Sequence, residues 1–269
     1  MQPKLQILPP SRRIELVEKS GLSADDRLKL IELIQLEIAD KLEGVFPGVS
    51  AAVYHHPLCP GLSHSSVSEA VKSGTNWLLS SKWQSQAMKL GSAFHTKALE
   101  PHFFQSEFPE GSLSHDDLVA IDGMLSALQS HSAYHQIFNP DLSRLIEVSI
   151  FAKCPITGLI RKVRPDVLIA KKAIIDLKTT GASNAEDFQA RADGLHYESQ
   201  VSYYMDTCSF VGLEVPDNYQ WAVGRKSPHW VEVFSYDESF LDAGRSRYLQ
   251  GLENIAALIQ QSRAQFKHG

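Results

Sequence analysis

Residues 164–180 constrain the fold more than any other part of the chain, because they read R-P-D-V-L-I-A-K-K-A-I-I-D-L-K-T-T. Two runs rich in β-branched and aliphatic residues, Val163–Ile169 and Ala173–Leu177, flank a polar pair formed by Lys171 and Lys172. Such runs, separated by a short polar turn, are typical of a β-hairpin. The second run begins with three consecutive apolar residues, which favours a central strand of a sheet.

Charged residues lie at the ends of this predicted hairpin. Asp166 opens the first strand, and Asp176 and Lys178 close the second. Because successive side chains of a strand point to opposite faces, Asp176 and Lys178 share a face while Leu177 points into the core. Carboxylate and carbonyl oxygens suit Mg²⁺ or Mn²⁺. A metal beside a lysine suits the hydrolysis of phosphodiesters.

A simpler interpretation of Asp176 and Lys178 is a solvated ion pair, which is what an Asp and a Lys two residues apart on a strand usually form. Here the pair follows an apolar run that favours a buried strand. A buried charge needs a partner or a metal. The hairpin alone therefore leaves both interpretations open.

The composition limits the class of protein. Hydrophobic residues are 43% and charged residues 21% of 269, as in a soluble protein with one large domain or a domain and an appendage. No apolar run approaches the roughly 18 residues of a membrane span, and the first five residues lack a signal-peptide core. The three cysteines have no C-x-x-C spacing, which disfavours disulfides and structural zinc. We therefore expect a cytoplasmic protein that does not contact a membrane.

The net charge of −5 argues against a protein coated in positive charge for loose binding to nucleic acid. It is compatible with an enzyme that has a confined basic groove. An acidic exterior would discourage DNA from binding anywhere else.

Two helices are predicted near the N-terminus, over residues 11–42. Ser23, followed by Asp26, is typical of the start of the second helix. The segment from Gly44 to Gly48 contains Pro47 and predicts a turn or linker. We expect a helical appendage over residues 1–48 and a single domain over residues 49–269.

A helix predicted over residues 85–99 places Gly91 and His95 on one face, one turn apart. The glycine leaves room there for another chain segment or a ligand. Taken alone, His95 would more often be a satisfied core histidine. Earlier in the chain, Ser63 and Ser65 lie in a serine cluster at the start of a helix, where their hydroxyls can meet phosphate oxygens.

The second half of the chain predicts the sheet and its covering helices. Residues 147–152 and 159–169 are expected to form a three-stranded meander with the second strand of the hairpin, carrying Glu147, Asp166, Asp176 and Lys178. Gln200 and Tyr204 lie four residues apart on a long helix and project together. The remaining predicted elements are a helix over 116–128, a helix over 185–191, the long helix over 197–211, strands over 220–224 and 230–235, and a helix over 238–265.

The ordered set His95, Asp166, Asp176-Leu177-Lys178, Gln200 and Tyr204 resembles the PD-(D/E)xK nuclease superfamily, in the form shared by RecB-type nuclease domains. The resemblance is closer still to RecE-like exonucleases of the exodeoxyribonuclease VIII type. It covers residues 50–240 and includes the runs L-G-S-A-F-H at 90–95, R-P-D at 164–166 and D-L-K-T-T at 176–180. One departure is Asp176, which stands where many members of the superfamily have Glu.

The resemblance implies a mixed central β-sheet flanked by helices, with the restriction-endonuclease-like core of this superfamily. It implies that Asp166, Asp176, the Leu177 carbonyl and His95 bind Mg²⁺, for which Mn²⁺ can substitute. Lys178 would position or activate the attacking water and stabilise the growing charge. The other implied roles are orientation of the lysine or phosphate by Gln200 and Tyr204, an additional acid at Glu147, and phosphate contacts by Ser63, Ser65, Arg161 or Arg164.

The implied activity is 5′→3′ digestion of one strand at double-stranded DNA ends, leaving 3′ tails for a RecT-type annealing protein. The resemblance also implies a ring-shaped homotetramer of bacterial or phage origin with DNA in its channel. No P-loop sequence occurs, so no need for ATP is expected. The alternatives are a nuclease of the same fold with another specificity, such as a single-strand exonuclease or a structure-selective endonuclease, and a non-catalytic DNA-binding module.

Overall fold

The predicted hairpin forms the middle of a five-stranded sheet in the computed structural model, which describes residues 8–73, 85–138 and 143–266. Strands β5 and β6 pair antiparallel, with Val167 opposite Ile175. The order in this sheet is β2-β5-β6-β7-β8, and a separate three-stranded sheet has the order β1-β3-β4. The strands are β1 (Gly44–Phe46), β2 (Arg144–Ile146), β3 (Ser149–Lys153), β4 (Ile160–Val163), β5 (Val167–Ile169), β6 (Ala173–Thr180), β7 (Asp217–Gly224) and β8 (Val231–Phe234).

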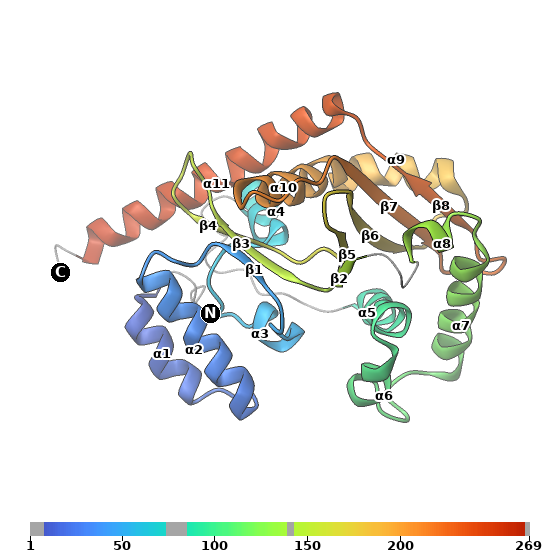
Figure 1. The fold of residues 1–269 in the computed structure, drawn as a ribbon, viewed down its shortest axis with the longest axis horizontal. Coiled ribbons are helices and arrows are strands. Elements are labelled where there is room, and N and C mark those ends of the chain that lie inside the picture. Colours follow the sequence, from blue (N-terminus) through green and yellow to red (C-terminus); the bar gives the residue numbers. More distant parts are fainter. Residues whose placement is uncertain (1–7, 74–84, 139–142, 267–269) are drawn as a thin grey trace.

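Helices cover both sheets, so the predicted mixed sheet flanked by helices is confirmed (Figure 1). No helix in the described ranges is both long enough and apolar enough to cross a membrane. The helices are α1 (Pro10–Glu18), α2 (Ala24–Ile38), α3 (Ala51–His55), α4 (His64–Ser73), α5 (Gln86–Leu99), the 3₁₀ helix η3 (Pro101–Phe103), α6 (Phe104–Glu107), α7 (His115–Ser130), α8 (Tyr134–Ile137), α9 (Ala185–Leu195), α10 (Tyr197–Phe210) and α11 (Glu238–Phe266).

The central strand β6 divides the interior into two cores, because its side chains alternate between faces. Ile175 and Leu177 point to one face, where they pack with Trp221 and with residues of α5 and α7. Ile174 points to the other face, where α10 and α11 provide Tyr203 and other apolar side chains. Both faces of β6 are therefore buried, as its apolar sequence predicts.

Strand β7 joins β6 in parallel, with Ala173 opposite Asp217 and Thr180 opposite Gly224. The connection between the two strands runs through α9 and α10, since parallel neighbours require a crossover. This crossover lays α10 across the face that carries Asp176 and Lys178. The two strands predicted to extend the sheet are both present as β7 and β8.

The N-terminal helices pack against the three-stranded sheet. Val17 of α1 and Leu33 of α2 share a core with Val53 and with Phe151 of β3. The predicted start of the second helix is confirmed, because the Ser23 hydroxyl accepts a hydrogen bond from the Asp26 amide. Figure 1 shows α1 and α2 side by side, on the same side of β1 as α3.

Two predictions about the strands are wrong. The three-stranded meander does not form, because the chain leaves β4 at Val163 and starts β5 at Val167, in the other sheet. Pro165 lies in this gap and has no N–H to continue a ladder. The predicted linker at Gly44–Gly48 contains β1, which pairs with β3. Strand β1 is only three residues long. Gly44 and Gly48, at its start and just after its end, are typical of a turn and not of a strand.

A test of the packing between α10 and α11 is Gly244→Ala. A β-carbon added at Gly244 would overlap the carbonyl oxygen of Glu198, which belongs to backbone and has little freedom to move. Alanine favours a helix by up to about 1 kcal/mol over glycine, but overpacking costs about 1–3 kcal/mol. We expect Gly244→Ala to lower the free energy of unfolding, measured by urea denaturation.

The matched control is Gly194→Ala in α9, where an added β-carbon meets nothing within 4 Å. We expect this change to leave the protein as stable as the wild type or slightly more stable. Equal stability of Gly244→Ala and the wild type would contradict the close approach of the two helices.

Candidate active site

Asp166 lies at the point where the chain passes from one sheet to the other. Its side chain is almost fully buried, and its Oδ2 accepts a hydrogen bond of 2.5 Å from the Leu177 amide of β6. Its Oδ1 lies 3.5 Å from Nδ1 of His95. Asp166 therefore connects β5, β6 and α5.

His95 reaches this carboxylate because α5 packs closely against β6. At Gly91, one turn before His95, an added β-carbon would lie 3.1 Å from Oγ1 of Thr179. The segment for which Gly91 leaves room is therefore β6. The imidazole is about one-quarter exposed, so it faces the site rather than the core.

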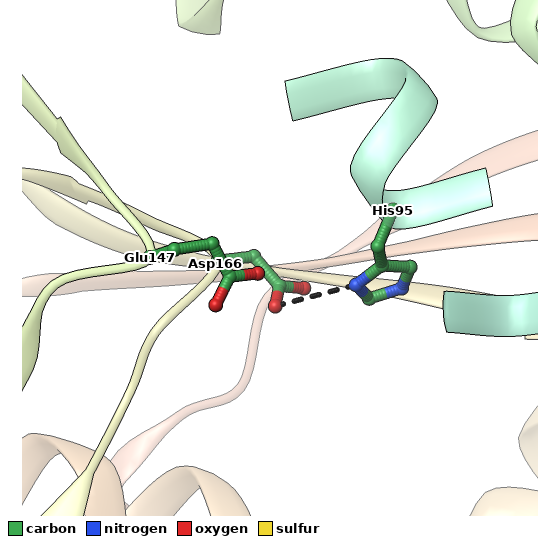
Figure 2. A group of neighbouring side chains, drawn as sticks. All are labelled: His95, Glu147 and Asp166. Carbon is green, nitrogen blue, oxygen red and sulfur yellow. Dashed lines mark ion pairs between the residues drawn. The ribbon is translucent and has the colours of Figure 1, made fainter. Parts of the chain in front are cut away.

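Glu147 enters the same site from a turn between β2 and β3, not from within the predicted strand. Its φ of +48° is in the left-handed region, which is unfavourable for a residue other than glycine. Its amide donates to the Asp166 carbonyl oxygen at 3.1 Å. One ligand atom from each of His95, Glu147 and Asp166 lies within 4.8 Å of the others, and Figure 2 shows both carboxylates pointing toward the same space as the imidazole.

Asp176 and Lys178 share a face of β6, as predicted. Nζ of Lys178 lies 2.6 Å from Oδ2 of Asp176. Nε2 of Gln200 on α10 donates to the other carboxylate oxygen at 3.0 Å. The ammonium also lies 5.3 Å from the ring centroid of Tyr197, a distance typical of a cation–π contact. The pair is thus enclosed and not a solvated surface pair.

Tyr204 lies one turn beyond Gln200 on α10, and both line a small cavity next to Asp176. Burial raises the pKa of the Tyr204 phenol well above its usual value, and the nearby carboxylates raise it further. The phenol is therefore neutral and can act as a hydrogen-bond donor. The structure brings together the four residues predicted on β6 and α10.

The charges in the site control one another. Burial alone would lower the pKa of Lys178, but Asp176, Tyr197 and Asp166 outweigh it and the pKa is raised. Burial raises the pKa of Asp176. For Asp166, burial is outweighed by His95, Lys178 and the Leu177 amide, which lower its pKa. Lys178 is consequently a cation at neutral pH.

The pKa values of His95 and Glu147 are also strongly shifted. Burial would lower the pKa of His95, but Asp166 and the other acids raise it to about 9. Burial and the charge of Asp166 raise the pKa of Glu147 to about 7, against the opposing effect of Arg164. Shifts of this size are characteristic of functional sites.

The donor set fits a hard divalent cation. The site offers two carboxylates and an imidazole, and one ligand atom of each lies within 4.8 Å of the others. Next to it lies the Asp176 carboxylate, which contacts Lys178 through Oδ2 and Gln200 through Oδ1. Leu177 follows Asp176 in β6, donates its amide to Asp166, and has its side chain buried in the core.

Of the two arginines predicted to contact phosphate, one lies at the site and the other does not. Arg164 faces the site, but its Nε donates to Glu147 at 2.7 Å and its Nη1 to the Val49 carbonyl at 2.7 Å. Arg161 is completely buried, 4.0 Å from the Tyr203 ring centroid, and is not brought to the site.

Ser63 and Ser65 lie at the start of α4, where their hydroxyls are 3.0 Å apart. His64, between them, was not predicted as a site residue, although its Nε2 is 3.0 Å from the Ser199 hydroxyl. Burial and the charge of Lys178 lower its pKa to about 3, so it is neutral. The aromatic residue at 197 was also missed. Tyr197 is the first residue of the predicted helix over 197–211, but nothing in the sequence indicated its contact with the lysine.

Comparison with known proteins agrees with this geometry. Residues 70–266 match the family model described as "PDDEXK-like domain of unknown function (DUF3799)". A crystal structure from Eubacterium rectale, of a protein described as a candidate exonuclease, is similar with a TM-score of 0.60 and 14% identity. The similarity covers 75% of this chain and 82% of that chain. No curated protein matches the sequence.

Two further solved structures have lower similarity. LHK-Exo in complex with dAMP has a TM-score of 0.37 at 13% identity, with 77% of this chain and 94% of that chain covered. SSO0001 has a TM-score of 0.29 at 16% identity, with 68% and 84% covered.

The raised pKa of Glu147 predicts how stability changes with pH in metal-free protein. The folded state holds a proton on Glu147 up to about pH 7, whereas the unfolded state releases it near the ordinary value of 4.5. Stability from this group is therefore present below pH 4.5 and is lost as the pH rises through 7. We expect the free energy of unfolding to fall by about 1–3 kcal/mol between pH 5 and pH 7, and Glu147→Gln to reduce this fall.

Urea denaturation in EDTA at several pH values measures the effect. Glu186→Gln, at an exposed position of α9, is the matched control and should keep the wild-type slope. An identical slope in Glu147→Gln and the wild type would show that Glu147 is not held protonated.

Proposed function

Because the chain belongs to the family of PDDEXK-like domains (DUF3799), we propose that it is a metal-dependent 5′→3′ exodeoxyribonuclease. It degrades one strand of linear double-stranded DNA and leaves 3′ single-stranded tails for recombination by strand annealing. The observation that carries this proposal is the meeting of Asp166, Asp176 and Lys178 with His95 and Glu147 at one end of the hairpin.

Lys178 acts in this proposal as a fixed cation. Its raised pKa favours the ammonium form at neutral pH, so the proposal gives it no role as a base. An ammonium held in place by a carboxylate can hydrogen-bond the attacking water and stabilise the charge that grows on the phosphate oxygens. Asp176 holds the ammonium, and Gln200 in turn holds Asp176.

Asp166, Glu147 and His95 are the residues that would hold the cation, with Asp176 beside them. Nucleases of the PD-(D/E)xK type generally depend on divalent metals, and carboxylate ligands favour Mg²⁺ or Mn²⁺. A bound cation supplies activation of water and neutralisation of the phosphate oxygens. Arg164 supports the set by fixing the Glu147 carboxylate.

The strand polarity, the RecT-type partner and a tetrameric ring with DNA in its channel are supported by the resemblance to RecE-like exonucleases. The net charge of −5 is compatible with a ring whose basic groups line the inside. The proposed setting is a bacterial or phage-infected cytoplasm, and no ATP is needed.

Digestion of linear duplex DNA tests the activity. The DNA is labelled at one 5′ end or at one 3′ end, and the reaction contains Mg²⁺ without ATP. We expect the 5′ label to be released early as a mononucleotide. Lys178→Ala and Asp166→Ala should each lower the rate by about 10²–10³-fold or more, because each removes charge stabilisation in the reaction.

Lys172→Ala, in the exposed turn of the hairpin, is the matched control and should retain the wild-type rate. Early release of the 3′ label would reverse the proposed polarity. Cutting of closed circular DNA would indicate an endonuclease, and tight binding without cutting would indicate a DNA-binding module.

Metal binding can be tested without DNA. Mg²⁺ should stabilise the folded protein by about 2.7 kcal/mol at a hundred times its Kd, measured by urea denaturation with Mg²⁺ or EDTA. Asp166→Asn should lose this stabilisation, because it removes a charged ligand. Asp122→Asn, on the exposed side of α7, should keep it. No change of stability with Mg²⁺ in the wild type would exclude the metal site.

A further inference from the structure

A glutamine is buried directly beside Asp176. Gln220 of β7 pairs with Asp176 of β6 in the parallel register, so the two side chains lie on the same face. Only 1% of Gln220 is exposed. A polar side chain at the centre of a sheet is unfavourable unless its hydrogen-bonding groups are used.

One end of the Gln220 amide is fixed by Tyr236. The Tyr236 hydroxyl donates to Oε1 of Gln220 at 2.7 Å. The backbone of Tyr236 is itself held by Asn218, which accepts from its amide and donates to its carbonyl, each at 3.1 Å. The orientation of the glutamine is therefore set from the side away from the active site.

The other end of the amide has a donor to spare. Nε2 of Gln220 is buried and makes no hydrogen bond with any described residue. Gln220, Asp176 and Gln200 line one cavity of about 10 Å³, which is the size of a single water. The unused donor of Gln220 thus shares a small space with a carboxylate whose oxygens already contact Lys178 and Gln200 and can each accept one further hydrogen bond.

We propose that Gln220 is a positioning residue for Asp176. Its amide N–H donates to the carboxylate, directly or through one water, and Gln200 donates to the same carboxylate from α10. The two amides together fix the plane of the carboxylate against Lys178 and the metal ligands. The inference rests on the proposed function, because it gives Asp176 its place in a metal site.

Mn²⁺ binding by calorimetry at fixed pH tests the proposal on the full-length chain. Gln220→Leu removes the amide, and Tyr236→Phe leaves the amide in place but releases its orientation. Removing groups that orient metal ligands typically weakens metal binding 10- to 100-fold. We expect a loss of about that size for Gln220→Leu and a smaller loss for Tyr236→Phe.

Tyr248→Phe is the matched control for Tyr236→Phe. It also removes a tyrosine hydroxyl from a hydrogen bond in the interior, here the bond to Asp206, and it should bind Mn²⁺ like the wild type. A merely structural role for Gln220 would lower stability in Gln220→Leu and Tyr236→Phe without changing their Mn²⁺ affinity. That result would overturn the proposal and leave the proposed function intact.

A double-mutant cycle in EDTA tests the contact without metal. The unfolding equilibrium constant of Gln220→Leu combined with Asp176→Ala should differ about threefold or more from the product of the single effects. Additive effects would overturn the proposal. If the wild type neither bound Mn²⁺ nor cut DNA, the proposed function would fail, and this cycle would still decide whether Gln220 holds Asp176.

Discussion

The hydrogen bond from the Leu177 amide to Asp166 joins the start of β5 to the middle of β6, and the rest of the site is arranged around it. Asp166 follows Pro165, where the chain crosses between two sheets and has no ladder of its own. The hydrogen bond ties this stretch to β6 and fixes the carboxylate. His95 and Glu147 are then positioned against this carboxylate, from a helix and from a strained turn.

The three acids of the site are matched by three cations, one for each. His95 lies 3.5 Å from Asp166, Lys178 lies 2.6 Å from Asp176, and Arg164 lies 2.7 Å from Glu147. This matching allows the carboxylates to be buried in the metal-free protein. A histidine must be neutral to bind a metal. Because its pKa is about 9, His95 has to lose a proton before it can ligate a cation at neutral pH.

Local sequence patterns predicted the elements that this site is built on. The alternation along residues 173–178 predicted which face carries Asp176 and Lys178, and helical spacing predicted that Gln200 and Tyr204 project together. The glycine at 91 predicted a close neighbour, which is β6. These features depend on short-range geometry, so the sequence was sufficient for them.

Features that depend on pairing between distant segments were not predictable in the same way. The division of residues 159–169 between two sheets depends on which partner each half finds, and Pro165 was the only local signal for it. A single glutamine such as Gln220 in an apolar strand does not by itself indicate a site. Its position beside Asp176 follows from the parallel register of β6 and β7. The contact of Tyr197 with Lys178 likewise depends on how α10 lies across β6.

The parallel pairing of β6 with β7 has a consequence for the order of events during synthesis. Residues 181–216 separate the two strands, and they include α9 and α10. A chain still on the ribosome has Asp166, Asp176 and Lys178 long before it has Gln220. The sheet around them closes only when β7 has emerged, so the growing polypeptide carries an unassembled site while it is next to the nucleic acids of the translation machinery.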